Sequence, residues 1–130
     1  MNTKTLHQTV EIRASPHDVY EALMDSKKHS EFTGDEAIIG RNVGDPFSAF
    51  SEWATGVNKE LIPDKKIVQT WRGEDWPEDH YSVVTYELKP TEVGTLLEFT
   101  QTDIPEEFFE EISEGWVDNY WEPLKEYLSP

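Results

Sequence analysis

Large aromatic side chains are the main candidates for binding chemistry in this 130-residue chain, which contains five Trp, five Tyr and six Phe. Trp71, Tyr86 and Phe99 occupy alternating positions of segments typical of strands, and Trp116 lies in a later segment with helical spacing. We expect these elements to face one another, so that their rings line an interior space. The candidate cavity residues, with nearby polar groups included, are Trp71, Tyr86, Phe99, Gln101, Trp116, Asn119 and Tyr120.

Two interpretations of this aromatic wall are open. It lines a pocket for a small hydrophobic ligand, or it is ordinary core, since aromatic residues at strand and helix spacing usually pack against one another. The amides of Gln8, Gln69, Gln101 and Asn119 fall near the same inward register. Unpaired amides are costly to bury, which favours a partly wet cavity, although solvation at the sheet edge explains some of them equally well.

Residues suited to metal or acid–base chemistry are poorly grouped. His80 lies near Asp75, Glu78 and Asp79, but one His among flexible carboxylates favours a solvated loop over a metal site. The chain has no Cys, no glycine-rich phosphate loop and no visible pairing of nucleophile and base. We therefore expect no catalytic residue, no metal and no cofactor, and a protein that is not an enzyme.

A second candidate site is the loop of residues 73–79, which carries Trp76 and Pro77 among acidic neighbours. An exposed Trp in such surroundings is a candidate contact point for another protein. Alternatively, the Trp76 ring folds back over the rim of the pocket. The sequence does not decide between these two placements.

The net charge of −16, with a pI near 4.4, restricts the partners. Nucleic acids and anionic membrane surfaces require clustered Lys and Arg, so we expect neither as a partner. The acidity is interpreted as a solvated surface or as a face for a basic protein. The first residues include no apolar run, and no stretch approaches the roughly 20 apolar residues that span a bilayer, so a cytoplasmic location is expected. We expect a monomer or a weak dimer.

The hydrophobic periodicity predicts an α+β fold in one domain, residues 1–130. Alternation and turn residues predict strands at 6–12, 37–40, 47–53, 55–62, 67–72, 82–88 and 97–101. Ser15 and Pro16 begin a helix after the first strand, and residues 25–34 form a second short helix or turn. From Pro105 onwards apolar residues recur at helical spacing, with a kink expected near residues 119–121 because Pro123 lacks a backbone donor. A sheet of six to seven strands must curl to cover this long C-terminal helix.

Several short motifs give a more specific indication. Trp71-Arg72, Trp76-Pro77-Glu78 and Gly115-Trp116, with the segment 119–125, resemble the C-terminal type of domain in the family of heat-shock-protein-90 ATPase activators. The resemblance implies a helix-grip (START-like, SRPBCC or Bet v 1-like) fold, in which many proteins hold an apolar ligand between sheet and helix. The eukaryotic co-chaperones carry a further N-terminal domain, so the chain resembles single-domain homologues of undefined role.

The two resulting hypotheses belong to different classes. In the first, the protein is a non-catalytic binding protein that holds a small hydrophobic molecule between the sheet and the C-terminal helix. In the second, it is a protein-interaction module, an accessory of a chaperone protein.

Overall fold

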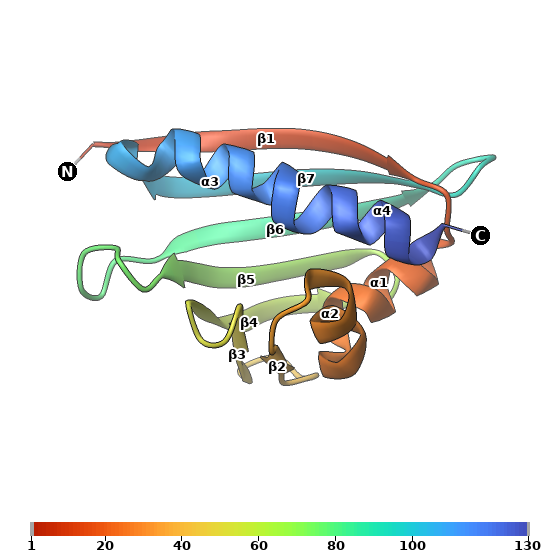
Figure 1. Ribbon diagram of the computed structural model, residues 1–130, viewed down its shortest axis with the longest axis horizontal. Helices are drawn as coiled ribbons and strands as arrows, with labels where there is room; N and C mark the ends of the chain where they lie inside the picture. The colour runs from red at the N-terminus through yellow and green to blue at the C-terminus, as the bar shows by residue number, and fades with distance from the viewer. Residues whose placement is uncertain (1, 130) are drawn as a thin grey trace.

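In the computed structural model, which describes residues 2–129, seven strands form one antiparallel sheet (Figure 1). The strand order is β1-β7-β6-β5-β4-β3-β2, so every neighbouring pair except β1–β7 is consecutive in sequence. The strands are β1 (Thr3–Ile12), β2 (Ile38–Ile39), β3 (Pro46–Ala49), β4 (Ala54–Ile62), β5 (Lys66–Gly73), β6 (Ser82–Pro90) and β7 (Thr95–Pro105).

Two short helices follow β1, and a long helical segment follows β7. The first two are α1 (Pro16–Met24) and α2 (Ser26–Thr33), and the C-terminal segment consists of η1 (Glu106–Phe108), α3 (Phe109–Trp116), η2 (Val117–Trp121) and α4 (Glu122–Leu128). The Ser15 side chain accepts a hydrogen bond from the Asp18 N–H at 3.1 Å, and Pro16 begins α1, as the sequence predicts. The predicted fold class is confirmed: the C-terminal segment lies along the face of the curved sheet (Figure 1).

One face of the sheet is apolar because the central strands alternate buried and half-buried residues. In β5, Ile67 and Trp71 are buried, and in the paired strands Tyr86 lies directly opposite Phe99. These residues face the C-terminal helical segment, whose Ile112, Trp116, Tyr120, Trp121 and Leu124 are buried. The apolar face that alternation gives the strands and the apolar face that helical spacing gives the C-terminal segment therefore pack together in one core.

The predicted irregularity before Pro123 takes the form of a π-helical turn, η2. Proline cannot donate to the carbonyl one turn earlier, and a wider turn in the preceding residues accommodates that lost bond. The wider turn also places residues five apart in the sequence on the same side of the helix. Trp116 and Trp121 stack with ring centroids 5.5 Å apart and an interplanar angle of 20°, while Tyr120 lies 4.5 Å from Trp116.

Three of the four amides expected to point inward, those of Gln8, Gln69 and Gln101, are hydrogen-bonded to other protein groups, whereas Asn119 is exposed. The Trp116 indole N–H donates to Gln101 Oε1 at 2.8 Å, Gln101 Nε2 donates to Ser82 Oγ at 2.9 Å, and Ser82 donates to the Trp71 carbonyl at 2.7 Å. The Trp121 indole likewise donates to Gln8. The inference that inward amides mark a wet cavity is therefore wrong for Gln101 and Gln8, because buried indoles supply their partners.

Two strands are shorter than expected. β2 is limited to Ile38–Ile39, and β3 ends at Ala49 rather than at residue 53. Phe50, Ser51 and Glu52 have φ values of 54°, 54° and 75°, and three successive left-handed residues cannot continue a strand. The segment after Ala49 is therefore a turn, and its apolar residues Phe50 and Trp53 pack against the core on the inner side of the sheet.

The buried chain of hydrogen bonds through Gln101 gives a first prediction. Replacing this residue with the apolar, similarly sized Met (Gln101→Met) leaves the Trp116 N–H buried without an acceptor. We expect the free energy of unfolding in urea to fall by about 1–3 kcal/mol. A double-mutant cycle with Trp116→Phe isolates the pair: the Gln101→Met loss should be smaller in the Trp116→Phe background. Strictly additive losses would contradict the assignment of this bond.

Candidate functional site

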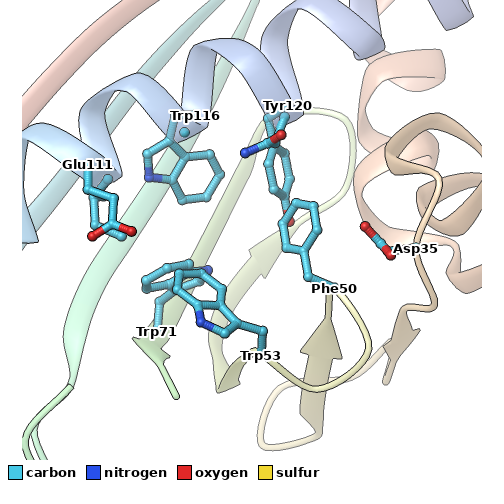
Figure 2. A pocket seen from close by; sticks show the side chains of 10 residues that line it. Asp35, Phe50, Trp53, Trp71, Glu111, Trp116 and Tyr120 are labelled. Carbon is cyan, nitrogen blue, oxygen red and sulfur yellow. The ribbon is translucent and has the colours of Figure 1, made fainter. Parts of the chain in front are cut away.

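A cleft of about 360 Å³ opens between the C-terminal helical segment and the β3–β4 loop (Figure 2). This volume falls within the range of small-molecule pockets, roughly 300–1,000 Å³. The lining residues come from α2's end, the β3–β4 loop, β5 and the helical segment: Asp35, Phe50, Trp53, Trp71, Glu111, Ile112, Gly115, Trp116, Asn119 and Tyr120.

Aromatic rings form most of the cleft wall. Figure 2 shows Trp116 and Tyr120 projecting from the helix towards Trp71, Trp53 and Phe50 on the sheet side. Ring centroids are 5.8 Å apart for Trp71–Trp116, 5.7 Å for Trp53–Trp71 and 5.5 Å for Phe50–Tyr120. The rings contact one another at the base and sides of the cleft, and these contacts fix the orientation of the rings that bound the open space.

The β3–β4 loop that presents Phe50 and Trp53 has a strained backbone. Its residues Phe50, Ser51 and Glu52 are all left-handed without being glycine, which costs each of them roughly 1 kcal/mol or more. Backbone hydrogen bonds hold the loop: Ser51 N–H donates to the Glu36 carbonyl at 2.9 Å, and Trp53 N–H donates to the Phe50 carbonyl at 3.1 Å. Strain of this kind is concentrated at ligand clamps and active sites, which favours a functional role for the loop.

Gly115 keeps the helix side of the cleft open. A Cβ atom at this position would meet only Asn119 Nδ2, at 3.7 Å, so the space beside it is empty. Glycine inside a helix costs about 1 kcal/mol relative to alanine. The packing therefore does not require glycine here, and the missing side chain leaves the helix side of the cleft wider.

The polar groups of the cleft are few. Asp35, Glu111 and Asn119 are exposed at its lining. The Trp71 indole N–H is buried and has no hydrogen-bond partner among residues 2–129. The indole N–H of Trp76, which does not line the cleft, is buried without a partner in the same way.

A comparison with protein families covers most of the chain. Residues 13–129 match the family described as Activator of Hsp90 ATPase homolog 1-like protein. The chain belongs to this family.

Individual relatives show which fold the family has and how much of their length this chain covers. A protein named Activator of 90 kDa heat shock protein ATPase homolog, from Dictyostelium discoideum, is 37% identical over 98% of this chain and 33% of its own length. An HSP90 activator from Plasmodium falciparum has a crystal structure with a TM-score of 0.88, 28% identity and 95% coverage of both chains. The Aha1 dimer from Colwellia psychrerythraea, at 22% identity over 96% of both chains and a TM-score of 0.83, shares the fold. The chain spans about a third of the length of the curated relatives it matches.

The structure of this family member divides the predicted cavity residues into two groups. Trp71, Trp116, Asn119 and Tyr120 line the cleft. Tyr86, Phe99 and Gln101 are buried behind the Trp116 indole and do not line it. Phe99 and Gln101 do not line the cleft because the Trp116 ring centroid lies 4.3 Å from that of Phe99 and the Trp116 N–H donates to Gln101. Tyr86 lines a second, much smaller cavity on the other side of Tyr120, with Gln69 and His29.

Phe50, Trp53 and Asp35 were not among the predicted site residues. Phe50 and Trp53 were assigned to a strand, and Asp35 follows α2 in a segment with no apolar pattern. The signal that could have indicated them is the sequence Phe50-Ser51-Glu52-Trp53, in which two aromatic residues flank two polar ones. That pattern fits a loop with both rings turned to one side as well as it fits a strand.

Trp76 adopts the inward of its two expected placements. It is 4% exposed, with its ring 5.3 Å from Trp71 and stacked on Phe108 at 6.1 Å. The Arg72 guanidinium donates to the carbonyls of Trp76 and Pro77 at 2.9 and 3.3 Å and so holds the loop. The idea of Trp76 as an exposed contact is therefore corrected, while a protein contact at half-buried Pro77 stays a prediction.

The other sequence candidates for chemistry are dispersed. His80 Nε2 donates to the Asp103 carbonyl at 2.8 Å, which orients its ring against the loop. Between residues 2 and 129, no group of three or more His, Asp or Glu side chains is arranged to hold a metal ion. In the same range, no helix has the length and apolarity needed to cross a membrane.

His29 supports the cleft from behind. It is 5% exposed, its Nδ1 lies 3.0 Å from the Leu23 carbonyl and its Nε2 lies 2.8 Å from Tyr120 Oη. Because a carbonyl only accepts, Nδ1 carries the proton and the Tyr120 hydroxyl donates to Nε2. Burial lowers the pKa of His29 to about 4 and raises the pKa of the Tyr120 phenol far above its ordinary range, so neither group exchanges protons readily near neutral pH.

The low pKa of His29 predicts a pH-dependent stability. Between about pH 6.5 and pH 4 the unfolded chain binds a proton that the folded chain excludes, so stability falls as the pH falls through this window. The loss from this group should be about 2 kcal/mol between pH 7.5 and pH 5. In chemical denaturation followed by Trp fluorescence, His29→Gln should show a shallower pH dependence than the natural sequence, whereas the exposed control His17→Gln should not. Equal slopes for all three proteins would refute the assignment.

Proposed function

We propose that this protein is a non-catalytic binding protein that takes an apolar group into the cleft beside Trp116. The observation that carries the proposal is the unfilled cleft of about 360 Å³ walled by five aromatic side chains. Apolar surface left open between sheet and helix is unfavourable in water, and a ligand that covers it gains roughly 25 cal/mol per Å² buried.

Two further features support a ligand rather than a packing defect. Gly115 leaves the helix side of the cleft open at a cost in helix stability, and the strained loop of residues 50–52 holds Phe50 and Trp53 at the sheet side. Both features cost folding stability, and neither fills the cleft. Tyr120, with its raised pKa, and the buried, neutral His29 act here as structural groups and not as an acid or a base.

Substitution of Gly115 tests the proposal, with the neutral compound naphthylmethanol as the probe. Gly115→Ala should raise the free energy of unfolding by up to about 1 kcal/mol and retain binding. Gly115→Leu places a branched side chain in the cleft and should weaken binding at least about tenfold, since a blocked apolar pocket loses several methylene-sized contacts. Nitrogen-15 NMR spectra of the indole N–H groups of Trp53, Trp71 and Trp116 report where the probe binds.

The matched control is Asp118→Leu, an exposed position of the same helical segment that does not line the cleft. This variant should bind naphthylmethanol as the natural sequence does. Failure of the natural sequence to bind the probe, or equal affinity in Gly115→Leu, would overturn the proposal.

A second candidate function is that of an accessory to the 90 kDa heat shock protein ATPase. It is favoured by the family match over residues 13–129 and by the 37% identity to a relative named as an activator of that ATPase. The chain corresponds to about a third of that relative, so the full activator's activity is carried over only as a proposal.

The chaperone role predicts a saturable rise in ATP turnover when the chain is added to a purified 90 kDa heat shock protein. Gly115→Leu serves as the discriminating variant. Stimulation lost in this variant assigns chaperone contact to the cleft, and stimulation retained assigns it to another surface. Absence of any change in turnover, together with no complex by analytical ultracentrifugation, would exclude this second function.

A further inference from the structure

The charged groups of the aromatic cleft all have one sign. Asp35 and Glu111 are its only ionisable residues besides Tyr120, and no Lys, Arg or His is among the lining side chains. In Figure 2 the two carboxylates lie on either side of the aromatic rings. An apolar ligand that fills the space between the rings therefore has a carboxylate near each end.

Neither carboxylate is neutralised by the protein. Within residues 2–129, the side-chain ion pairs use other acids, namely Asp64, Glu21, Glu60, Glu98 and Glu122. Asp35 is fixed just after α2, where its backbone N–H donates to Thr33 Oγ1 at 3.3 Å. Glu111 lies in the first turn of α3. Both side chains are exposed and free to meet a ligand cation.

The aromatic walls favour the same sign of charge. The faces of Trp, Tyr and Phe carry negative partial charge, and a cation within about 6 Å of a ring centroid is attracted to them. Trp53, Trp71, Trp116, Tyr120 and Phe50 surround the cleft. The net charge of −16 adds a long-range field that concentrates cations and repels anions.

From this combination, and resting on the proposed binding function, we infer that the cleft is selective for an organic cation. The ligand class is an apolar body of one or two rings, or a chain of similar bulk, that carries an ammonium or guanidinium group. The apolar body lies between Trp53, Trp71 and Trp116, and the cation meets Asp35 or Glu111, with the Asn119 amide oxygen available as a further acceptor. Fatty acids and other anions of the same size are rejected because the site would leave their charge beside uncompensated carboxylates.

Three probes with the same ring system test this selectivity: naphthylmethylamine, naphthylmethanol and naphthoate. We expect the amine to bind about tenfold more tightly than the alcohol, from one cation–π contact and one partly exposed ion pair, and naphthoate to bind more weakly than both. Part of the advantage of the amine should disappear at high salt, because exposed charges are screened. Nitrogen-15 NMR shifts of the indole N–H groups give both the location and the dissociation constant.

Charge-removing variants identify the residues responsible. Asp35→Asn and Glu111→Gln keep the shape of each side chain. Only the variant at the carboxylate that meets the ammonium should lower the preference for the amine, by about threefold, and the double variant should retain the share that comes from the cation–π contact. The control Glu110→Gln removes the same charge from an exposed neighbour that does not line the cleft. It should leave the ratio of amine to alcohol affinity unchanged.

The outcomes separate this inference from the binding function on which it rests. If none of the three probes binds, the proposed function fails. If the amine and the alcohol bind the cleft equally, or Glu110→Gln alters the ratio as much as the two cleft variants do, the function stands and the cation selectivity is overturned.

The same cationic chemistry is available from a free metabolite or from a basic side chain of a partner protein. A further titration uses the blocked dipeptide acetyl-Phe-Lys-amide. Tighter binding of naphthylmethylamine indicates a free small-molecule ligand, and tighter binding of the dipeptide indicates a side chain of a protein. Both results support a cationic ligand, whereas binding of the dipeptide that is insensitive to Asp35→Asn and Glu111→Gln contradicts it.

Discussion

The burial of the Trp116 indole at the junction of helix and sheet is the constraint on which the rest of this structure depends. Its N–H must find an acceptor away from water, and Gln101 on β7 supplies it at 2.8 Å. Phe99 packs against the ring at 4.3 Å, and the π-helical turn brings Trp121 into a stack on it. These contacts fix the register of the helix on the sheet. They also explain why the polar Gln101 lies in the middle of the apolar face: it accepts the hydrogen bond of the Trp116 indole.

Trp116 also divides the interior into two parts with different properties. On one side, Phe99 and Tyr86 are packed into the core, with exposures of 1% and 3%. On the other side, Gly115 and the loop of residues 50–53 leave a cleft. Solid core and pocket, the two interpretations of the aromatic pattern, are both present in different halves of one layer. The family's sheet-and-helix fold thus provides a rigid half that positions the open half.

The sequence predicted the fold more completely than the cleft, for physical reasons. Strand and helix periods are local, so all seven strands and the long helix were predictable from hydrophobic spacing and turn residues, although β2 and β3 are shorter than expected. Which amide pairs with which indole is a tertiary choice that no local pattern contains. The turn after Ala49 was missed because left-handed backbone in Phe50 to Glu52 is imposed by surrounding contacts and not by glycine. Likewise, the inward position of Trp76 depends on Arg72, Trp71 and Phe108 together.

Family membership establishes the fold and leaves the role of the cleft as the central question. The most direct measurement is a crystal structure of the protein grown with naphthylmethylamine. The account predicts the naphthalene ring between Trp53 and Trp116, with the ammonium in ion-pair contact with Asp35 or Glu111 and the Phe50–Trp53 loop in place. A structure in which the loop collapses onto Trp116 and closes the cleft, or in which the amine binds elsewhere, would contradict it.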